Sequence, residues 1–93
     1  PPPAPVILCG DLHAGPLSNT HRTLSRFLTD VQKDNKNLRP SVSQPTFHSR
    51  SPLFRIDHIF VSRHFRTLNV EVTRTLDTQT ASDHLPLMAD LAM

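Results

Sequence analysis

The chain has 93 residues, of which 37% are hydrophobic, and it contains five Phe but neither Trp nor Tyr. Ten Lys and Arg against eight Asp and Glu give a formal net charge of +2, which excludes the dense basic surface of a dedicated DNA-binding domain. The single cysteine, Cys9, excludes an internal disulfide and favours a reducing compartment, so we expect a cytoplasmic protein; no run approaches the ~18 apolar residues of a membrane-spanning helix.

The first predicted elements are a strand and a helix, which follow a proline-rich lead-in over residues 1–5. Residues 6–9 (Val-Ile-Leu-Cys) form a continuous apolar run, typical of a strand buried on both faces. After a loop, apolar residues recur at i, i+3, i+4 and i+7, which predicts a helix with one buried stripe. The stripe consists of Leu24, Phe27, Leu28 and Val31. The solvent-facing side of the helix consists of Arg22, Arg26, Asp30 and Lys33. Ser18 or Thr20 is the candidate N-cap.

Residues 34–53 lack periodicity and are rich in Asn, Lys, Ser and Pro, so they predict a long loop that is either functional or disordered. Three strands follow. Residues 55–62 (Arg-Ile-Asp-His-Ile-Phe-Val-Ser) are apolar on both faces, which predicts a central strand. Residues 68–76 place Leu68, Val70 and Val72 on one face, and residues 85–91 place their Leu and Ala residues on one face.

This order of elements predicts an α+β fold in which one sheet of about four strands is accompanied by one helix. Two of the strands require burial on both faces, whereas one helix covers one face of a sheet at most. The predicted burial is therefore larger than the chain can supply by itself. We expect residues 1–93 to be part of a larger domain, completed by a missing half or by a second copy of the chain.

Three acidic residues and one histidine occupy positions that a structural role alone explains poorly. Asp11 directly follows a buried strand, and Asp57 lies within the predicted central strand. Asp83 precedes His84 just before the last strand. A buried carboxylate costs several kcal/mol unless it is paired or binds a metal, so Asp57 predicts a partner, and His84 is the candidate. Such a pair, together with two carboxylates that hold Mg²⁺ or Mn²⁺, suits the attack of water on a phosphate ester.

Each of these signals also has an ordinary structural interpretation. For Asp11, which precedes a loop, the roles of turn residue and active-site residue have equal weight. Asp83 alone fits a local cap, whereas Asp57 is harder to explain because strand interiors disfavour Asp. No pair of His or Cys residues has the spacing of a zinc site, and Cys9 has no adjacent base that would make it a nucleophile.

Three segments together resemble the endonuclease/exonuclease/phosphatase superfamily, which includes the AP endonucleases and the pancreatic-type deoxyribonuclease. They are residues 6–16 (Val-Ile-Leu-Cys-Gly-Asp-Leu-His-Ala-Gly-Pro), residues 55–62 and residues 81–87 (Ala-Ser-Asp-His-Leu-Pro-Leu). Thr46-Phe47 also resembles the short segment that the family places before its Arg-Ile-Asp strand. The resemblance implies the C-terminal half of a two-sheet β-sandwich flanked by helices. The N-terminal half of the family fold would supply the other sheet and the principal metal-binding Glu.

The resemblance also implies roles for individual residues. Asp11 would contact the attacking water or the leaving group, and Asp83 would associate with the metal. Asp57 would orient His84, which would be the catalytic histidine. His13 departs from the family pattern, which has an Asn whose amide contacts the scissile phosphate; a neutral imidazole can donate one hydrogen bond there.

Two other functions compete with phosphoester hydrolysis. A non-catalytic scaffold or assembly module is favoured by His13 and by the short chain, which leaves open whether the chain is an active enzyme by itself. Nucleic-acid binding through Arg side chains is a weaker alternative, because the net charge is small and aromatic residues are few. Within the long loop, Arg50 and His48 are the candidate contacts to the substrate.

Overall fold

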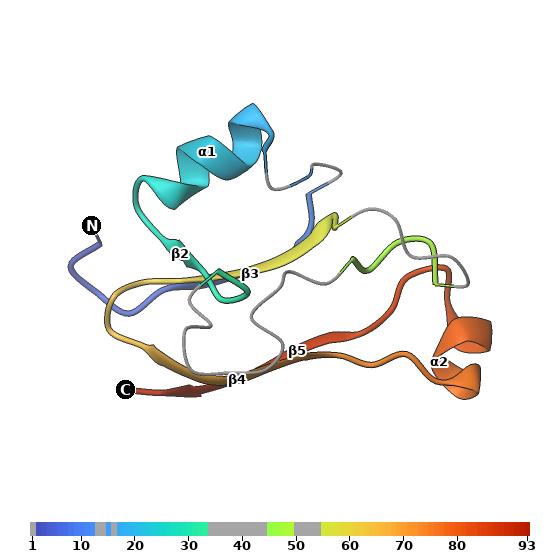
Figure 1. The fold of residues 1–93 in the computed structure, drawn as a ribbon. Coiled ribbons are helices and arrows are strands. Elements are labelled where there is room, and N and C mark those ends of the chain that lie inside the picture. Colours follow the sequence, from blue (N-terminus) through green and yellow to red (C-terminus); the bar gives the residue numbers. More distant parts are fainter. Residues whose placement is uncertain (1, 13–14, 16, 34–44, 50–54) are drawn as a thin grey trace.

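The computed structural model describes residues 2–12, 15, 17–33, 45–49 and 55–93, which form two antiparallel sheets and two helices (Figure 1). The elements are β1 (Ile7–Asp11), α1 (Asn19–Ser25), β2 (Thr29–Asp30), β3 (Asp57–Val61), β4 (Arg66–Val72), α2 (Leu76–Ala81) and β5 (Leu87–Ala92). The first sheet has the order β1-β3-β2, and the second pairs β4 with β5. The α+β class is confirmed, although the sequence predicts one sheet and one helix.

β3 is the central strand of the first sheet, as its two apolar faces predict. Successive side chains of a strand point to opposite faces, so each face of β3 meets a different neighbour. Phe60 lies beside α1, where its ring centroid is 5.1 Å from that of His21. Val61 packs into the core that lies between β3 and the β4–β5 sheet. Figure 1 shows α1 on one side of β3 and β4–β5 on the other.

The hydrophobic core lies between the two sheets. Its buried members are Val31, which directly follows β2, Val61 of β3 and Val70 of β4. The partly buried residues packed against them are Ile59, Phe65, Leu87, Ala89 and Leu91. The alternation predicted for the last strand is thus confirmed, and Met88 on its other face is 57% exposed.

A bulge in β4 changes which of its residues face the core. Thr67 pairs with Leu91, whereas Asn69 pairs with Asp90, so Leu68 is an extra residue in the ladder. A bulge turns the strand locally, and Leu68 is consequently 45% exposed. The prediction that Leu68 shares a face with the two valines that follow is therefore wrong.

β1 is exposed along its whole length, although the sequence predicts a strand buried on both faces. Ile7 is 52% exposed, Leu8 is 39% exposed, and Cys9 is an exposed free thiol. β1 forms an edge of its sheet, and no layer in the described part of the chain covers it. The prediction of burial for β1 and for Cys9 is wrong for this chain taken by itself.

The first helix begins as predicted but ends early. Ser18 is its N-cap, and the Ser18 Oγ accepts a hydrogen bond from the backbone N–H of His21 at 3.1 Å. The chain then enters β2, and directly after it the Val31 N–H donates to the Ile59 carbonyl at 3.0 Å. β-branched residues such as Thr29 and Val31 favour an extended backbone. Asp30 is only 2% exposed, so its predicted place on the solvent-facing side of a helix is wrong.

α2 is a second helix that the sequence analysis does not predict. Its N-terminus has a capping box in which Thr75 Oγ1 accepts from the Thr78 N–H at 3.1 Å and Thr78 Oγ1 accepts from the Thr75 N–H at 2.7 Å. The signal is weak in sequence because the second member of such a box is usually Glu or Gln.

The predicted long loop falls largely outside the described residues, which include only residues 45–49 of it. Neither helix of the described ranges has the length and apolar character needed to cross a membrane.

Candidate active site

Asp57 and His84 lie side by side where β3 begins. The Asp57 Oδ2 is 2.6 Å from the His84 Nδ1, which is hydrogen-bond distance. The Asp57 side chain is 21% exposed and the His84 side chain 27% exposed. The imidazole is the partner that burial of Asp57 predicts, and both side chains remain accessible to a small molecule.

Asp11 and Asp83 approach the other nitrogen of the same imidazole. The Asp11 Oδ2 is 3.7 Å from the His84 Nε2, and the Asp83 Oδ1 is 4.0 Å from it. Asp11 is placed by the sheet, because its Cα is paired with that of Asp57 across the β1–β3 ladder. The structure thus brings together all four of the acidic and histidine residues that the sequence singles out.

Local sequence features hold these side chains in place. Gly10, directly before Asp11, has a φ of +153°, which L side chains rarely adopt. The Ser82 Oγ accepts a hydrogen bond from the His84 N–H at 3.1 Å. Phe47 forms an isolated antiparallel bridge with His84, and the two ring centroids are 5.0 Å apart.

The electrostatic surroundings of His84 favour its protonated form. The hydrogen bond to Asp57 raises the pKa of His84 above its usual value of 6.5. The negative charges of Asp57, Asp11 and Asp83 raise it as well, whereas partial burial acts in the opposite direction. An imidazolium beside three carboxylates can donate a hydrogen bond from Nε2 to an anionic ligand.

A cavity of about 330 Å³ opens beside the Asp57–His84 pair. Its polar lining residues are Asp57, His58 and His84, and its apolar walls include Cys9, Ile59 and Leu85. Apolar walls with a few convergent polar groups are typical of small-molecule sites. The cavity therefore offers room for a substrate group next to the imidazole.

The donor set fits a hard divalent cation in its chemistry. Asp11, Asp57 and His84 each offer one ligand atom, and these atoms lie within 4.8 Å of one another. The Asp57 oxygen is already hydrogen-bonded to His84, so Asp11 is the better carboxylate donor of this group. Asp83 lies outside the group, with its Oδ1 4.0 Å from the His84 Nε2. Mg²⁺ prefers oxygen ligands and is commonly held by one or two carboxylates while it keeps several waters.

The predicted substrate contacts are only partly described. His48 is exposed beside Phe47, with the ring centroids 5.3 Å apart. Arg50 and His13 lie outside the described residues. His48 is therefore accessible and lies next to Phe47, which itself contacts His84.

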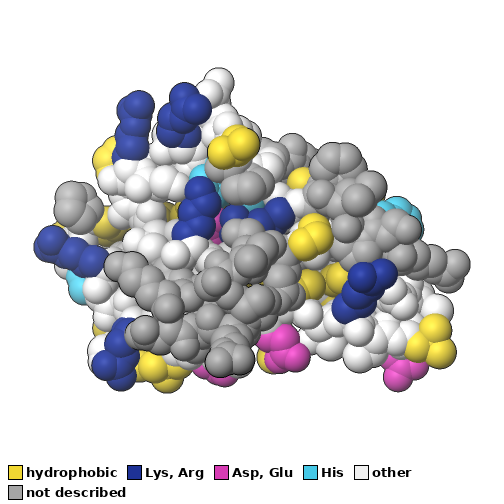
Figure 2. Space-filling view, viewed as in Figure 1, with side chains coloured by type: hydrophobic (Ala, Val, Ile, Leu, Met, Phe, Trp, Pro, Cys, Tyr) yellow, Lys and Arg dark blue, Asp and Glu magenta, His cyan; other side chains and the backbone are white. Residues whose placement is uncertain are grey.

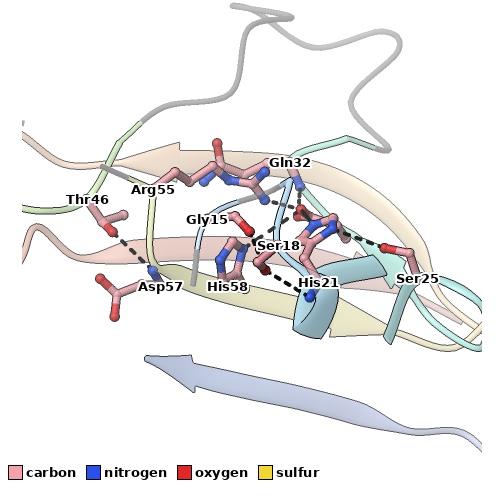
Figure 3. A network of polar contacts seen from close by, with 10 residues as sticks. Gly15, Ser18, His21, Ser25, Gln32, Thr46, Arg55, Asp57 and His58 are labelled. Carbon is pink, nitrogen blue, oxygen red and sulfur yellow. Dashed lines mark hydrogen bonds and ion pairs between the residues drawn. The ribbon is translucent and has the colours of Figure 1, made fainter. Parts of the chain in front are cut away.

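A second polar cluster, which the sequence analysis misses, is buried between α1 and β3 (Figure 3). It consists of His21, Asp30, Arg55 and His58, each at most 5% exposed. The Asp30 Oδ2 accepts from the His21 Nε2 at 2.7 Å and is bound by the Arg55 guanidinium. Burial alone would raise the pKa of Asp30, but these hydrogen bonds outweigh it and hold the pKa below its usual value of 3.8.

This buried cluster is better explained as structural than as a metal centre. His21, Asp30 and His58 place ligand atoms within 4.8 Å of one another. The Arg55 guanidinium, however, already neutralises the carboxylate that a cation would need. No sequence signal marks the cluster, because its members come from α1, β2, β3 and the segment before β3 and meet only after folding.

The distribution of positive charge agrees with the small net charge. On the face shown in Figure 2, the described Lys and Arg side chains are spread over several separate places and are not gathered into one stripe. A continuous basic surface is the usual electrostatic footprint of nucleic-acid binding. This face offers little support for that alternative.

Comparisons with known proteins agree with this geometry. A family model described as the Endonuclease/Exonuclease/phosphatase family matches residues 1–84. Among solved structures, the chain is similar to a functionally unknown conserved protein from Enterococcus faecalis V583, with a TM-score of 0.74 and 25% sequence identity. The similarity covers 95% of this chain and 36% of the other, so the chain spans about a third of the length of that structure. The comparison with curated proteins gives no match.

Proposed function

Because this chain belongs to the endonuclease/exonuclease/phosphatase family, we propose that it carries part of the active centre of a metal-dependent phosphoesterase. The reaction is hydrolysis of a phosphodiester or phosphomonoester by in-line attack of water. The observation that carries the proposal is the position of the His84 imidazole between Asp57, 2.6 Å from Nδ1, and Asp11, 3.7 Å from Nε2.

In this proposal, Asp57 orients the imidazole and His84 acts on the phosphate. Asp57 accepts a hydrogen bond from the His84 Nδ1–H, which directs Nε2 toward the substrate. The raised pKa of His84 keeps a larger share of the imidazole protonated near neutral pH. An Nε2–H donor is suited to stabilise the negative charge that develops on a phosphate oxygen in the transition state.

Asp11 is the proposed acceptor for the proton of the attacking water. Its carboxylate is the one nearest to Nε2, at 3.7 Å, so it lies where a water and a phosphate held by His84 would meet. The water oxygen forms a bond to phosphorus, the bond between phosphorus and the leaving oxygen breaks, and the leaving oxygen takes a proton from solvent.

Asp11 and Asp83 are also the proposed ligands of Mg²⁺ or Mn²⁺. A bound divalent cation would neutralise charge on the phosphate group. Two carboxylates are a small ligand set, so we propose that the centre is completed by another part of the protein. Residues 1–93 would then be the C-terminal half of a two-sheet sandwich, and a preceding half or a second copy would cover β1.

The remaining site residues have supporting roles in the proposal. His48, which is exposed beside Phe47, and Arg50 would contact the substrate, and His13 would donate a hydrogen bond to the phosphate. The free thiol of Cys9 agrees with a reducing compartment, for which we propose the cytoplasm.

The decisive experiment measures Mg²⁺-dependent cleavage of bis(p-nitrophenyl) phosphate by the full-length protein. His84→Ala should lower kcat by about 10²- to 10⁴-fold, the usual range for a group that transfers or shares a proton in the transition state. His64→Gln is the matched control, because His64 lies at the other end of β3, where it contacts Ser62. Equal rates for wild type and His84→Ala would contradict the proposal and favour a non-catalytic scaffold or assembly module.

A further inference from the structure

Thr46 joins the two segments that carry Asp57 and His84. Its side-chain Oγ1 accepts a hydrogen bond from the backbone N–H of Asp57 at 3.3 Å, as Figure 3 shows. Its backbone carbonyl accepts a hydrogen bond from the N–H of Leu85, the residue after His84, at 2.7 Å. Thr46 is therefore hydrogen-bonded both to the start of β3 and to the segment before β5.

The surroundings of Thr46 give these bonds weight. The residue is fully buried, at 0% exposed, so water does not compete for its hydroxyl or its carbonyl. Without the Thr46 acceptor, the half-buried Asp57 N–H would lose this hydrogen-bond partner. The next residue, Phe47, extends the same connection through its bridge to His84.

The other end of residues 45–49 is also hydrogen-bonded to the backbone near His84. The Ser49 N–H donates to the Asp83 carbonyl at 2.7 Å, and the Ser49 Oγ donates to the Gln79 carbonyl at 3.1 Å. The backbone near His84 is thus fixed at several points. On the β3 side, among the described residues, the Thr46 hydroxyl supplies the side-chain hydrogen bond from this segment.

We propose that Thr46 is a positioning residue that sets the separation and the angle between the Asp57 carboxylate and the His84 imidazole. This inference rests on the proposed function and adds a residue to it that touches neither substrate nor metal. A hydroxyl acceptor is required, and the γ-methyl group of Thr restricts χ1 so that the hydroxyl keeps one direction.

The test compares three variants of the full-length protein. Thr46→Val keeps the shape of the side chain but removes the acceptor, whereas Thr46→Ser keeps the acceptor. Thr67→Val is the matched control, because the buried Thr67 Oγ1 has no hydrogen-bond partner among the described residues. If Thr46→Val does not fold, Thr46→Ala is measured in its place, since it also lacks the acceptor.

Two measurements report on the role. In steady-state kinetics, Thr46→Val should lower kcat by about 100-fold, the scale expected for a displacement of ~1 Å, with KM changed less than about twofold. Imidazole ¹⁵N chemical shifts should show that the neutral His84 carries its proton on Nδ1 in wild type and in Thr46→Ser. In Thr46→Val, the tautomer with the proton on Nε2 should gain population.

The outcomes separate this inference from the function on which it rests. Unchanged kcat and an unchanged His84 tautomer in Thr46→Val overturn the role of Thr46. An equal loss in Thr46→Ser, or the same loss in Thr67→Val, overturns it too, because the Thr46 hydroxyl would then not be the cause. If wild type hydrolyses nothing, the proposed function fails, and the ¹⁵N spectra still decide whether Thr46 positions the pair.

Discussion

Asp57 and His84 are 27 residues apart in the chain, yet the Asp57 Oδ2 lies 2.6 Å from the His84 Nδ1. The two residues come from different parts of the fold: Asp57 begins β3 in the first sheet, and His84 precedes β5 in the second. Their contact therefore depends on how the two sheets are placed against each other. Any change that shifts one sheet should be detectable at the imidazole.

The pH dependence of stability should report on this pair. The pKa of folded His84 lies above 6.5, mainly because of Asp57, so protonation of His84 is favoured by folding. The resulting stabilisation is fully present below about pH 6.5 and is lost as the pH rises through the folded pKa. Asp57→Asn should lower the pKa of His84, as followed by NMR titration of the imidazole. The difference in the free energy of unfolding between wild type and Asp57→Asn should shrink from about pH 6 to about pH 8. A difference that grows over this range would contradict the assignment.

Metal binding should depend on the carboxylates near His84 Nε2. Asp11→Asn and Asp83→Asn should each weaken Mn²⁺ binding at least about tenfold, measured by calorimetry on the full-length protein. Asp90→Asn is the control, because Asp90 is an exposed carboxylate on β5. Removal of the metal with EDTA should abolish phosphodiester cleavage, and added Mg²⁺ should restore it. Equal affinities in all three variants would show that the cation binds elsewhere.

The buried Asp30–Arg55 pair should be a main determinant of stability. Asp30→Asn leaves the Arg55 guanidinium buried without its counter-charge, which should cost about 3–5 kcal/mol in urea unfolding. The exposed substitution Asp90→Asn should change the free energy of unfolding by no more than about 0.5 kcal/mol. Because the pKa of folded Asp30 is lowered, its contribution is present above pH 3.8 and is lost as the pH falls through the folded pKa. A wild type that resists acid no better than Asp30→Asn would argue against this role.

Cys9 should report whether another layer covers β1. In the described part of the chain Cys9 is exposed, and a covering half or second copy would bury it. Iodoacetamide labelling of the full-length protein, quantified by mass spectrometry on the peptide that contains Cys9, should therefore be slow relative to the urea-unfolded protein. Labelling as fast as in urea would show that β1 is open to solvent, and the proposed second layer would be wrong.

The α+β class, the central position of β3 and the one-sided β5 could be predicted from the sequence, because each depends on the periodicity of apolar residues. The exposure of β1 could not be predicted, because the apolar residues 6–9 indicate a buried strand. The pattern does not indicate which layer would cover that strand. The end of α1 and the start of β2 could not be predicted from the sequence either. Val31 fits the helical stripe, and only pairing with β3 reveals that it belongs to an extended segment.

For the candidate site, the sequence by itself determined that Asp57 needs a partner, since a carboxylate in a strand between apolar residues is costly if it stays unpaired. It also determined the residue types, carboxylates and an imidazole, from which the proposed chemistry starts. The tertiary structure alone decided which nitrogen of His84 faces which carboxylate, that Thr46 joins the two segments, and that Asp30 is buried beside Arg55. These facts are distances between residues far apart in the chain, and they are set by the packing of two sheets and a helix, which no local pattern encodes.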